Sequence, residues 1–344
     1  MIDLRSDTVT RPTPAMLAAM MRAPVGDDVI DVDPSVAALQ DKTAEVLGKE
    51  AAIFMPSGTM TNQIALRIHC SPGDEFLCEA DCHIYNYEQG AFAQLSGLVA
   101  RTVQGQIGVL RLADVRELIR PDNEHMVRTR LLCLENTHNR GGGKVLPHEE
   151  TLALCDWAHA EGIPTHLDGA RLFNAAVATG IQPRELARGF DSVSVCFSKG
   201  LGAPVGSCLA GSRDFIARAR RARKLFGGGM RQSGFLAAAA LYALDHQVER
   251  LAVDHQHAQR LATAVQNSPH LSLLGETVDT NIVIFKVAAE WGNAAQFNAE
   301  LLAHGIQAMA FSKQSIRMVT HLDVDSQQIE TTCQAIERIA RRTA

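Results

Sequence analysis

A lysine at the end of a predicted buried strand is the residue best suited to chemistry in this chain. Lys199 follows the β-branched and aromatic run 192–197, a pattern typical of a strand in the core of a protein. Burial disfavours an ammonium group and lowers the pKa of a lysine. A neutral lysine amine can then form a Schiff base with a carbonyl compound. Lys199 therefore indicates covalent catalysis, and the structural alternative is a strand-end lysine that extends to water.

The second chemical group is Asp168, which ends another short strand predicted over 163–167. The interval between Asp168 and Lys199 accommodates a turn, a helix over about 171–178 and a return strand. Both side chains would then leave the same edge of a parallel sheet, where such sheets bind ligands. A lysine that holds an aldehyde and a carboxylate that pairs with a pyridinium nitrogen suit pyridoxal phosphate. The alternative is a plain salt bridge.

Three further features are candidates for the same site. Ser57-Gly58-Thr59 joins the strand predicted over 51–56 to a helix predicted over 60–69, and a helix start of this kind binds anions. Ser57 or Thr59 can also be a simple helix cap. His83 lies just past a strand predicted over 75–78, where a histidine can lie over a ring or move a proton. Arg317 lies within an apolar strand, either in a structural pair or directed into a cleft, where it can bind a carboxylate.

Other kinds of site find less support. The glycine clusters 141–143 and 227–229 lack the spacing of a dinucleotide fingerprint, and no Gly-Lys-Ser/Thr follows Gly58. Cys78, Cys82 and His83 have no second cluster at zinc-ligand spacing, so we predict no metal site. The basic run 218–224 is interpreted as a solvated helix face that can also help to hold an anionic cofactor.

The order of elements predicts an α/β fold in two parts. Strands and helices alternate to about residue 245, which indicates a mostly parallel sheet of the seven-stranded type, covered by helices. From about residue 247 there are few strands, at 271–274, 280–285 and 315–321, each followed by a helix. We therefore expect a large domain with its N-terminal arm over 1–246, and a smaller C-terminal α+β domain over 247–344.

Composition excludes several classes of protein. The 344 residues are 46% hydrophobic and 21% charged, as in ordinary globular proteins, and a net charge of −5 argues against nucleic acid as a partner. The eight scattered cysteines are typical of reduced thiols rather than of a disulfide framework. The longest apolar stretch, 235–244, is too short to span a bilayer, and the N-terminus has no signal-like core. We expect a cytoplasmic protein with no membrane partner.

Seven ordered motifs together resemble the L-threonine aldolase family, a group of pyridoxal-phosphate lyases with the aspartate-aminotransferase-like fold (fold type I). The resemblance extends from the N-terminal arm to residue 322, so it covers nearly the whole chain. The motifs are Leu4-Arg5-Ser6-Asp7-Thr8, Pro56-Ser57-Gly58-Thr59-Met60, Cys82-His83-Ile84-Tyr85, Leu134-Glu135-Asn136-Thr137-His138-Asn139, His166-Leu167-Asp168-Gly169-Ala170-Arg171, the stretch from Ser198-Lys199 to Gly206, and Gly227-Gly228-Gly229-Met230-Arg231-Gln232.

The resemblance implies roles for individual residues. Lys199 would be the Schiff-base lysine, Asp168 the partner of the pyridinium nitrogen, and His83 a ring-stacking residue that also takes part in proton transfer. Gly58 and Thr59 would hold the phosphate. Arg171, Ser6 and Arg317 would meet the substrate carboxylate, and Arg171 would also lie near the cofactor ring. His125 would lie near the substrate hydroxyl. Lys224 and Arg231 would approach the site from a second subunit, with Arg231 on the cofactor side.

The implied activity is the retro-aldol cleavage of L-threonine, L-allo-threonine and related β-hydroxy-α-amino acids to glycine and an aldehyde. His83 or His125 would be the base. The resemblance also implies a homotetramer of catalytic dimers. In one place the chain departs from the family: residues 28–34 are Asp-Val-Ile-Asp-Val-Asp-Pro where relatives have Asp-Val-Tyr-Gly-Glu-Asp-Pro. This departure bears on substrate preference more than on the reaction. β-Elimination, racemisation and a non-catalytic scaffold are the alternatives.

Overall fold

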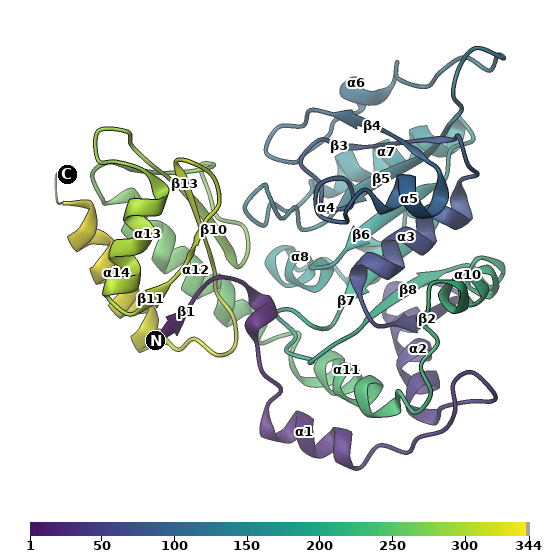
Figure 1. Cartoon of the computed structure of the whole chain (residues 1–344), viewed down its shortest axis with the longest axis horizontal. Coiled ribbons are helices and arrows are strands. Elements are labelled where there is room, and N and C mark those ends of the chain that lie inside the picture. Colours follow the sequence, from purple (N-terminus) through teal and green to yellow (C-terminus); the bar gives the residue numbers. More distant parts are fainter. Residues whose placement is uncertain (342–344) are drawn as a thin grey trace.

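A seven-stranded sheet forms the centre of the larger part of the molecule. In the computed structural model, which describes residues 1–341, the strand order of this sheet is β2-β8-β7-β6-β5-β3-β4 (Figure 1). β8 runs antiparallel to both of its neighbours, and the other neighbouring pairs are parallel. The strands are β2 (Ala51–Met55), β3 (Glu75–Glu79), β4 (Val99–Val103), β5 (Thr129–Glu135), β6 (Thr165–Gly169), β7 (Ser192–Cys196) and β8 (Ser207–Gly211). The predicted α/β class is confirmed, and β4 and β8 have no counterpart among the predicted strands.

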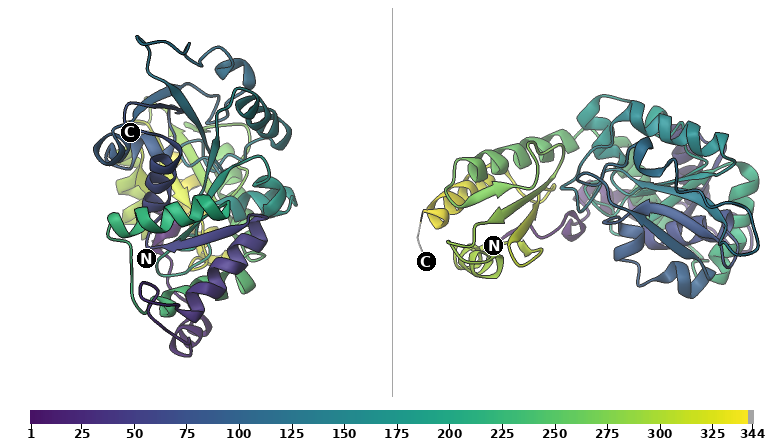
Figure 2. Two further views of the ribbon diagram at one scale, coloured as in Figure 1. Left: turned by 90° about the vertical axis from the view of Figure 1, so that its right-hand side faces the viewer. Right: turned by 90° about the horizontal axis from the view of Figure 1, so that it is seen from above.

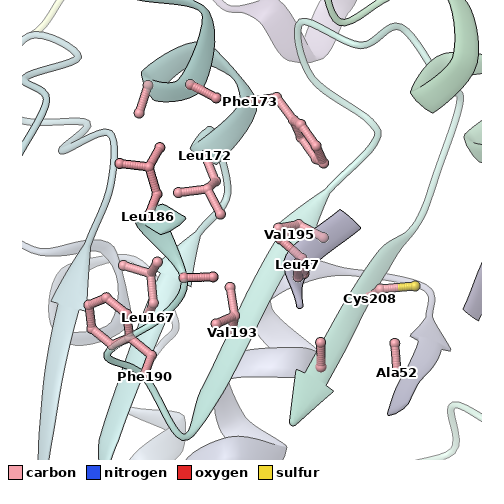
Figure 3. Packing of buried hydrophobic residues seen from close by; sticks show 14 of the residues in the cluster. Leu47, Ala52, Leu167, Leu172, Phe173, Leu186, Phe190, Val193, Val195 and Cys208 are labelled. Atoms are coloured by element: carbon pink, nitrogen blue, oxygen red, sulfur yellow. The ribbon is translucent and has the colours of Figure 1, made fainter. Parts of the chain in front are cut away.

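Helices cover both faces of this sheet because its central strands are buried on both sides. β3, β6, β7 and β8 are buried along their whole length. Leu167, Val193 and Val195 project from adjacent strands into one apolar cluster with Leu172 and Phe173 from the following helix (Figure 3). The main helices are α1 (Pro14–Met21), α2 (Pro34–Leu47), α3 (Gly58–His69), α5 (Ala91–Ser96), α7 (His148–Ala160), α8 (Leu172–Thr179), α10 (Arg213–Leu225) and α11 (Gly234–His246). Shorter helical turns are η1 (Asp7–Val9), α4 (His83–Asn86), α6 (Leu112–Val115) and α9 (Pro183–Leu186).

The C-terminal part is a four-stranded antiparallel sheet packed against three helices. Its strand order is β12-β13-β10-β9, and it has an apolar core of its own. Its elements are α12 (Leu251–Gln266), β9 (Leu271–Leu273), β10 (Ile282–Val287), α13 (Ala294–Ala303), β11 (Ile306–Gln307), β12 (Met309–Ala310), β13 (Ser315–Val319) and α14 (Ser326–Ala340). Viewed from above, this part lies beside the larger one (Figure 2). The predicted division at residues 246 and 247 falls between α11 and α12 and stays a prediction.

The N-terminal arm joins the two parts. β1 (Ile2–Asp3) pairs in parallel with β11 of the C-terminal part, and Leu4 belongs to that part's apolar core (Figure 1). The arm then continues through η1, where Asp7 bonds Arg171 of the large sheet's edge. The arm is therefore fixed at both ends, over the place where the two parts meet.

Sequence signals set several helix ends where they were expected. α1 and α2 begin with proline at their first positions and have Thr13 and Asp33 as caps. α2 ends at Gly48, whose φ of 62° is a conformation that favours glycine.

The interpretation of the basic run 218–224 as a solvated helix face is wrong for one of its residues. Arg223 of this run is buried and forms an ion pair with Asp28 at 2.7 Å.

Among residues 1–341, no helix combines the length and the apolar character needed to cross a membrane.

Candidate active site

The predicted catalytic groups meet past the carboxyl ends of β6 and β7. Asp168 is the fourth residue of β6, and Lys199 follows the end of β7 by one short turn. Lys199 lines a cavity of about 430 Å³. The predicted residues Ser6, His83, Arg171 and Arg317 line the same cavity, together with Thr8, Tyr87, Asn139, Met309, Ala310 and Phe311. The cavity therefore receives residues from the arm, the large sheet and the C-terminal part.

Asp168 is kept ionised within the fold. Burial raises the pKa of its carboxyl, but the charges of His83 and Lys199 and a hydrogen bond from Asn62 outweigh burial, so the pKa lies below its ordinary value. Asn62 Nδ2 donates to Asp168 Oδ2 at 2.8 Å, and the Ala170 N–H donates to Oδ1 at 3.1 Å. A buried, ionised carboxylate of this kind suits the protonated nitrogen of a pyridine ring.

His83 is oriented by a buried carboxylate. Its Nδ1 lies 3.0 Å from Glu88 Oε1, and Glu88 also accepts from Asn62 at 2.9 Å. Burial lowers the pKa of His83, but the hydrogen bond and charge of Glu88, with the charge of Asp168, raise it above its ordinary value. Ligand-type atoms of His83, Glu88 and Asp168 all lie within 4.8 Å of one another. Asn62 and Glu88 thus connect the acid and the histidine that the sequence analysis identified separately.

A chain of hydrogen bonds continues from Asp168 through the sheet. Asn62 Oδ1 lies 3.1 Å from His166 Nε2, and His166 Nδ1 lies 2.9 Å from Ser192 Oγ. Ser192 Oγ in turn lies 2.8 Å from His69 Nε2, at the far end of α3. We call this set the relay: Asp168, Asn62, His166, Ser192 and His69.

The chemistry of its members fixes the direction of every bond in the relay. Asn62 Oδ1 can only accept, so His166 Nε2 carries the proton. Burial lowers the pKa of His166 to about 4, so its ring is neutral at neutral pH and its Nδ1 accepts. Ser192 must then donate its one hydroxyl proton to His166 and accept from His69 Nε2. All four hydrogen bonds therefore point toward Asp168.

Arg171 and Arg317 bring positive charge to the cavity. Arg171 is buried and donates to both carboxylate oxygens of Asp7, at 2.8 and 2.6 Å. Arg317 donates to Asn139 Oδ1 and to the carbonyl oxygen of Arg5, both at 3.1 Å, while its buried Nε has no hydrogen-bond partner among the described residues. Burial and the neighbouring Arg171 lower the pKa of Arg317. With Asp7 bound to Arg171, the cavity keeps a surplus of positive charge that suits a carboxylate.

The start of α3 has free donors. Ser57 Oγ accepts from the Met60 N–H at 3.2 Å. In the part of the chain that the structure describes, no group accepts from the N–H of Gly58 or Thr59. A Cβ at Gly58 would lie only 2.7 Å from Cys196 Sγ, so a side chain does not fit there. These features fit a phosphate at the helix start. Among the described residues, Lys199 Nζ has one hydrogen-bond acceptor, Cys196 Sγ at 3.8 Å, so its amine is available to an aldehyde partner. The residues present thus fit pyridoxal phosphate.

Three predicted site residues lie away from the cavity of this single chain. His125 is in the segment between α6 and β5, where its side chain is 83% exposed and lies 3.7 Å from Glu124. Arg231 is half exposed and pairs with Asp27 at 2.9 Å. Lys224 is near the end of α10 and is exposed. Their predicted roles stay predictions.

Asn62 and Glu88 were not among the predicted site residues. Asn62 and Gln63 are buried polar residues of α3, and apolar residues are the rule at buried positions. Glu88 is buried between them and His83, and it accepts from Gln63 Nε2 at 2.5 Å. The available signal was the two consecutive amides directly before the apolar run 64–66 of α3, and the sequence does not show which partners they meet.

Comparison with known proteins agrees with this geometry. Residues 3–290 match the model of the beta-eliminating lyase family. The chain is 47% identical to the low specificity L-threonine aldolase of Escherichia coli K12, over 96% of each chain. Among solved structures, a Leishmania major threonine aldolase shares the fold with a TM-score of 0.85 at 21% identity, over 99% of this chain and 100% of that one. A serine palmitoyltransferase from S. paucimobilis with bound PLP and myriocin also shares the fold, with a TM-score of 0.76 at 18% identity, over 99% of this chain and 87% of that one. The chain belongs to the beta-eliminating lyase family and, within it, to the low-specificity L-threonine aldolases.

Proposed function

We propose that this protein is a carbon–carbon lyase that cleaves L-threonine, L-allo-threonine and related β-hydroxy-α-amino acids to glycine and an aldehyde, with pyridoxal phosphate as cofactor. One observation carries the proposal: Lys199, His83, Arg171 and Arg317 line a single cavity, beside the ionised Asp168. The 47% identity to an L-threonine aldolase over nearly the full length of both chains supports the same activity.

The residues that would hold the cofactor surround Lys199. Lys199 would bind the aldehyde carbon, Asp168 would pair with the ring nitrogen, and His83 would lie against the ring. The free N–H groups of Gly58 and Thr59 would bind the phosphate. When bound, the cofactor supplies an electron sink for the pair released as the Cα–Cβ bond breaks.

The substrate carboxylate would bind between Arg317 and Arg171. Arg317 has a buried Nε with no hydrogen-bond partner among the described residues. Asp7 engages Nε and Nη2 of Arg171, so no hydrogen bond to Asp7 occupies its Nη1. Ser6 lines the cavity beside them. Fixing the carboxylate at two points holds the Cα–Cβ bond in one orientation, which cleavage requires.

His83 would remove the β-hydroxyl proton. Its Nδ1 is engaged by Glu88, so Nε2 is the nitrogen left to accept. The hydroxyl oxygen then forms the aldehyde carbonyl as the Cα–Cβ bond breaks, and Cα takes up a proton to give glycine. His125 would act as this base only where it reaches the site.

We also propose a homotetramer of catalytic dimers, in which Lys224 and Arg231 reach a neighbouring chain's site. Their exposure in the single chain supports this role. All eight cysteines are unpaired and buried, which supports a cytoplasmic location. Sedimentation analysis would test the tetramer. A mixture of Lys199→Ala and Arg231→Ala chains, each inactive alone, would test the shared site, because mixed oligomers would regain activity.

Product analysis tests the function. The holoenzyme is incubated with L-threonine and with L-allo-threonine, and acetaldehyde, glycine and ammonia are measured. Equal amounts of acetaldehyde and glycine are expected. Release of ammonia would instead indicate β-elimination, a change in optical rotation without cleavage would indicate racemisation, and an absence of both cofactor binding and turnover would indicate a scaffold.

A further inference from the structure

A second cavity, rich in arginine, lies at the opposite edge of the large sheet from Lys199. Its volume is about 520 Å³, and its lining includes Arg67, Arg128, Arg130, Arg218 and His69. These residues come from the end of α3, the segment at the start of β5, and α10. The active site lies past the carboxyl ends of the strands, and this arginine pocket lies at their amino ends.

The positive charge of the arginine pocket is largely uncompensated. Arg128 pairs with Asp74 at 2.9 Å. Among the described residues, Arg67 and Arg218 donate only to main-chain carbonyl oxygens, at 2.7 and 2.6 Å. Arg130 is exposed, and its side chain forms no hydrogen bond or ion pair with any residue that the structure describes. Four guanidinium groups therefore share one carboxylate, in a chain whose net charge is −5.

The end of α3 explains only part of this charge. The C-terminus of a helix carries a negative charge of about half an electron, which one nearby cation is enough to offset. Arg218 is that cation, since it donates to the carbonyl oxygen of Ile68 in the last turn. Arg67 donates to the carbonyl oxygen of Leu95 near the end of α5, and Arg128 pairs with Asp74. Of the four arginines, Arg130 is thus the one whose side chain has no hydrogen-bond or ion-pair partner among the described residues.

The positive charge of the arginine pocket contributes to the lowered pKa of His69. Burial is the main cause that lowers its pKa to about 3, with smaller contributions from the neighbouring His166, Arg218 and Arg130 and an opposing one from Asp191. The pocket thus presents a positive field around a neutral imidazole that stacks on Phe215.

We propose that the arginine pocket binds a compact oxyanion of two or more negative charges, phosphorylated or polycarboxylic, at a site distinct from the catalytic one. A guanidinium presents a planar fork of donors that matches phosphate and carboxylate oxygens. Arg130 supplies a wholly free fork, and Arg67 and Arg218 each have donors beyond the one that is engaged. A cavity of this volume is within the range of small-molecule sites.

The relay links this pocket to the catalytic acid. His69 lines the pocket and is also the first donor in the chain of four hydrogen bonds that ends on Asp168. An anion beside His69 polarises the imidazole, and each successive hydrogen bond is polarised in the same direction. Binding at the pocket is therefore sensed at the carboxylate that faces the cofactor ring.

Calorimetric titration of the holoenzyme at constant ionic strength tests the site. Inorganic pyrophosphate and citrate are titrated separately into wild type, Arg130→Gln and the matched control Arg116→Gln, whose side chain is 62% exposed on α6's C-terminal side, outside the pocket. We expect one saturable site per chain, weakened about tenfold or more in Arg130→Gln and unchanged in Arg116→Gln. Saturation with pyrophosphate alone identifies a phosphorylated ligand, and saturation with citrate alone identifies a polycarboxylic one. No saturable binding of either anion, or equal binding in Arg130→Gln, overturns the proposal.

Ser192→Ala tests the link to Asp168. This change removes the central hydroxyl of the relay and its hydrogen bond with His69, and it leaves the four arginines of the pocket in place. Pyrophosphate, or citrate where that is the ligand, should still bind, but its effect on the absorption spectrum of the bound cofactor should disappear. An unchanged spectral response in Ser192→Ala would show that the relay does not carry the coupling.

Discussion

Arg171 donates to both carboxylate oxygens of Asp7, at 2.8 and 2.6 Å, and both side chains are buried. The pair joins the N-terminal arm to the loop that follows β6. Burial raises the pKa of Asp7, but the charge and hydrogen bonds of Arg171, with the charge of Lys199, hold that pKa well below its ordinary value. The arm is thus part of the active-site wall rather than a loose terminus.

Replacing Asp7 should therefore cost both stability and substrate binding. Asp7→Asn leaves Arg171 as a buried charge without its counterion, which costs about 3–5 kcal/mol of unfolding free energy. It also releases the guanidinium from its orientation, so KM for threonine should rise. Chemical denaturation and steady-state kinetics measure the two effects. Asp3→Asn, which affects an ion pair with the exposed Arg5, is the control, and equal losses in the two variants would contradict this role for Asp7.

Glu88→Gln should shift the pH dependence of kcat/KM. Glu88 is a principal cause of the raised pKa of His83, and His83 must be neutral to accept a proton. In the wild type, activity should therefore rise with pH through a value above the ordinary histidine pKa of 6.5. Removing the charge of Glu88 should move this limb to lower pH. Glu117→Gln, at an 85% exposed position, should not move it, and a limb that stays in place in Glu88→Gln would exclude His83 as the group titrated.

Changes along the relay should have graded effects on cofactor retention. Asn62→Ala removes a direct hydrogen bond to Asp168, and it also removes one hydrogen bond each from Glu88 and His166, which keep their other partners. Ser192→Ala acts two bonds further away. We expect cofactor dissociation to increase about tenfold or more in Asn62→Ala and less in Ser192→Ala, measured from the loss of cofactor absorbance on dilution. The opposite order would contradict the arrangement of the relay.

Acid should destabilise the protein before its carboxylates titrate. Burial lowers the pKa of His166 to about 4 and that of His69 to about 3, while both titrate near 6.5 when unfolded. Between these values the unfolded chain binds more protons, so stability falls as pH decreases from about 6.5 to 4. Asp7 and Asp168, whose pKa values are depressed, add their losses only at lower pH. The thermal midpoint of the wild type should fall as pH decreases across this range, and that of His166→Gln should fall less steeply. A wild-type thermal midpoint that does not change with pH in this range would contradict this role of the buried histidines.

The architecture and the common sheet edge of Asp168 and Lys199 could be predicted from the sequence because they depend on local patterns; the catalytic roles of the two residues stay predictions. Apolar strands that end in Asp168 and Lys199 predict a shared sheet edge whatever the rest of the fold does. The helices α1 and α2 follow directly from proline and cap positions at their starts. The antiparallel β8 could not be predicted in this way, because strand direction within a sheet depends on which strands become neighbours.

Buried polar partners were the part that the sequence left open. Glu88 looks like any acid of a surface turn until the fold places it against Asn62, Gln63 and His83. Arg223 looks like one more base of a solvated helix until Asp28 comes to lie beside it. His166 and His69 are far apart in sequence and meet only through Ser192. Such contacts depend on three-dimensional packing and leave no periodic signal.

The most direct test of the central claim is aldehyde release by Lys199→Ala, with Lys42→Ala as a control at an exposed ion pair. Both proteins are supplied with pyridoxal phosphate and L-threonine, reduced with borohydride in a parallel sample, and analysed for acetaldehyde and for the mass of the chain. If Lys199 is the amine that holds the cofactor, Lys199→Ala will lose acetaldehyde release and the covalent adduct, and Lys42→Ala will keep both. Aldehyde release at the wild-type rate from Lys199→Ala would contradict the account.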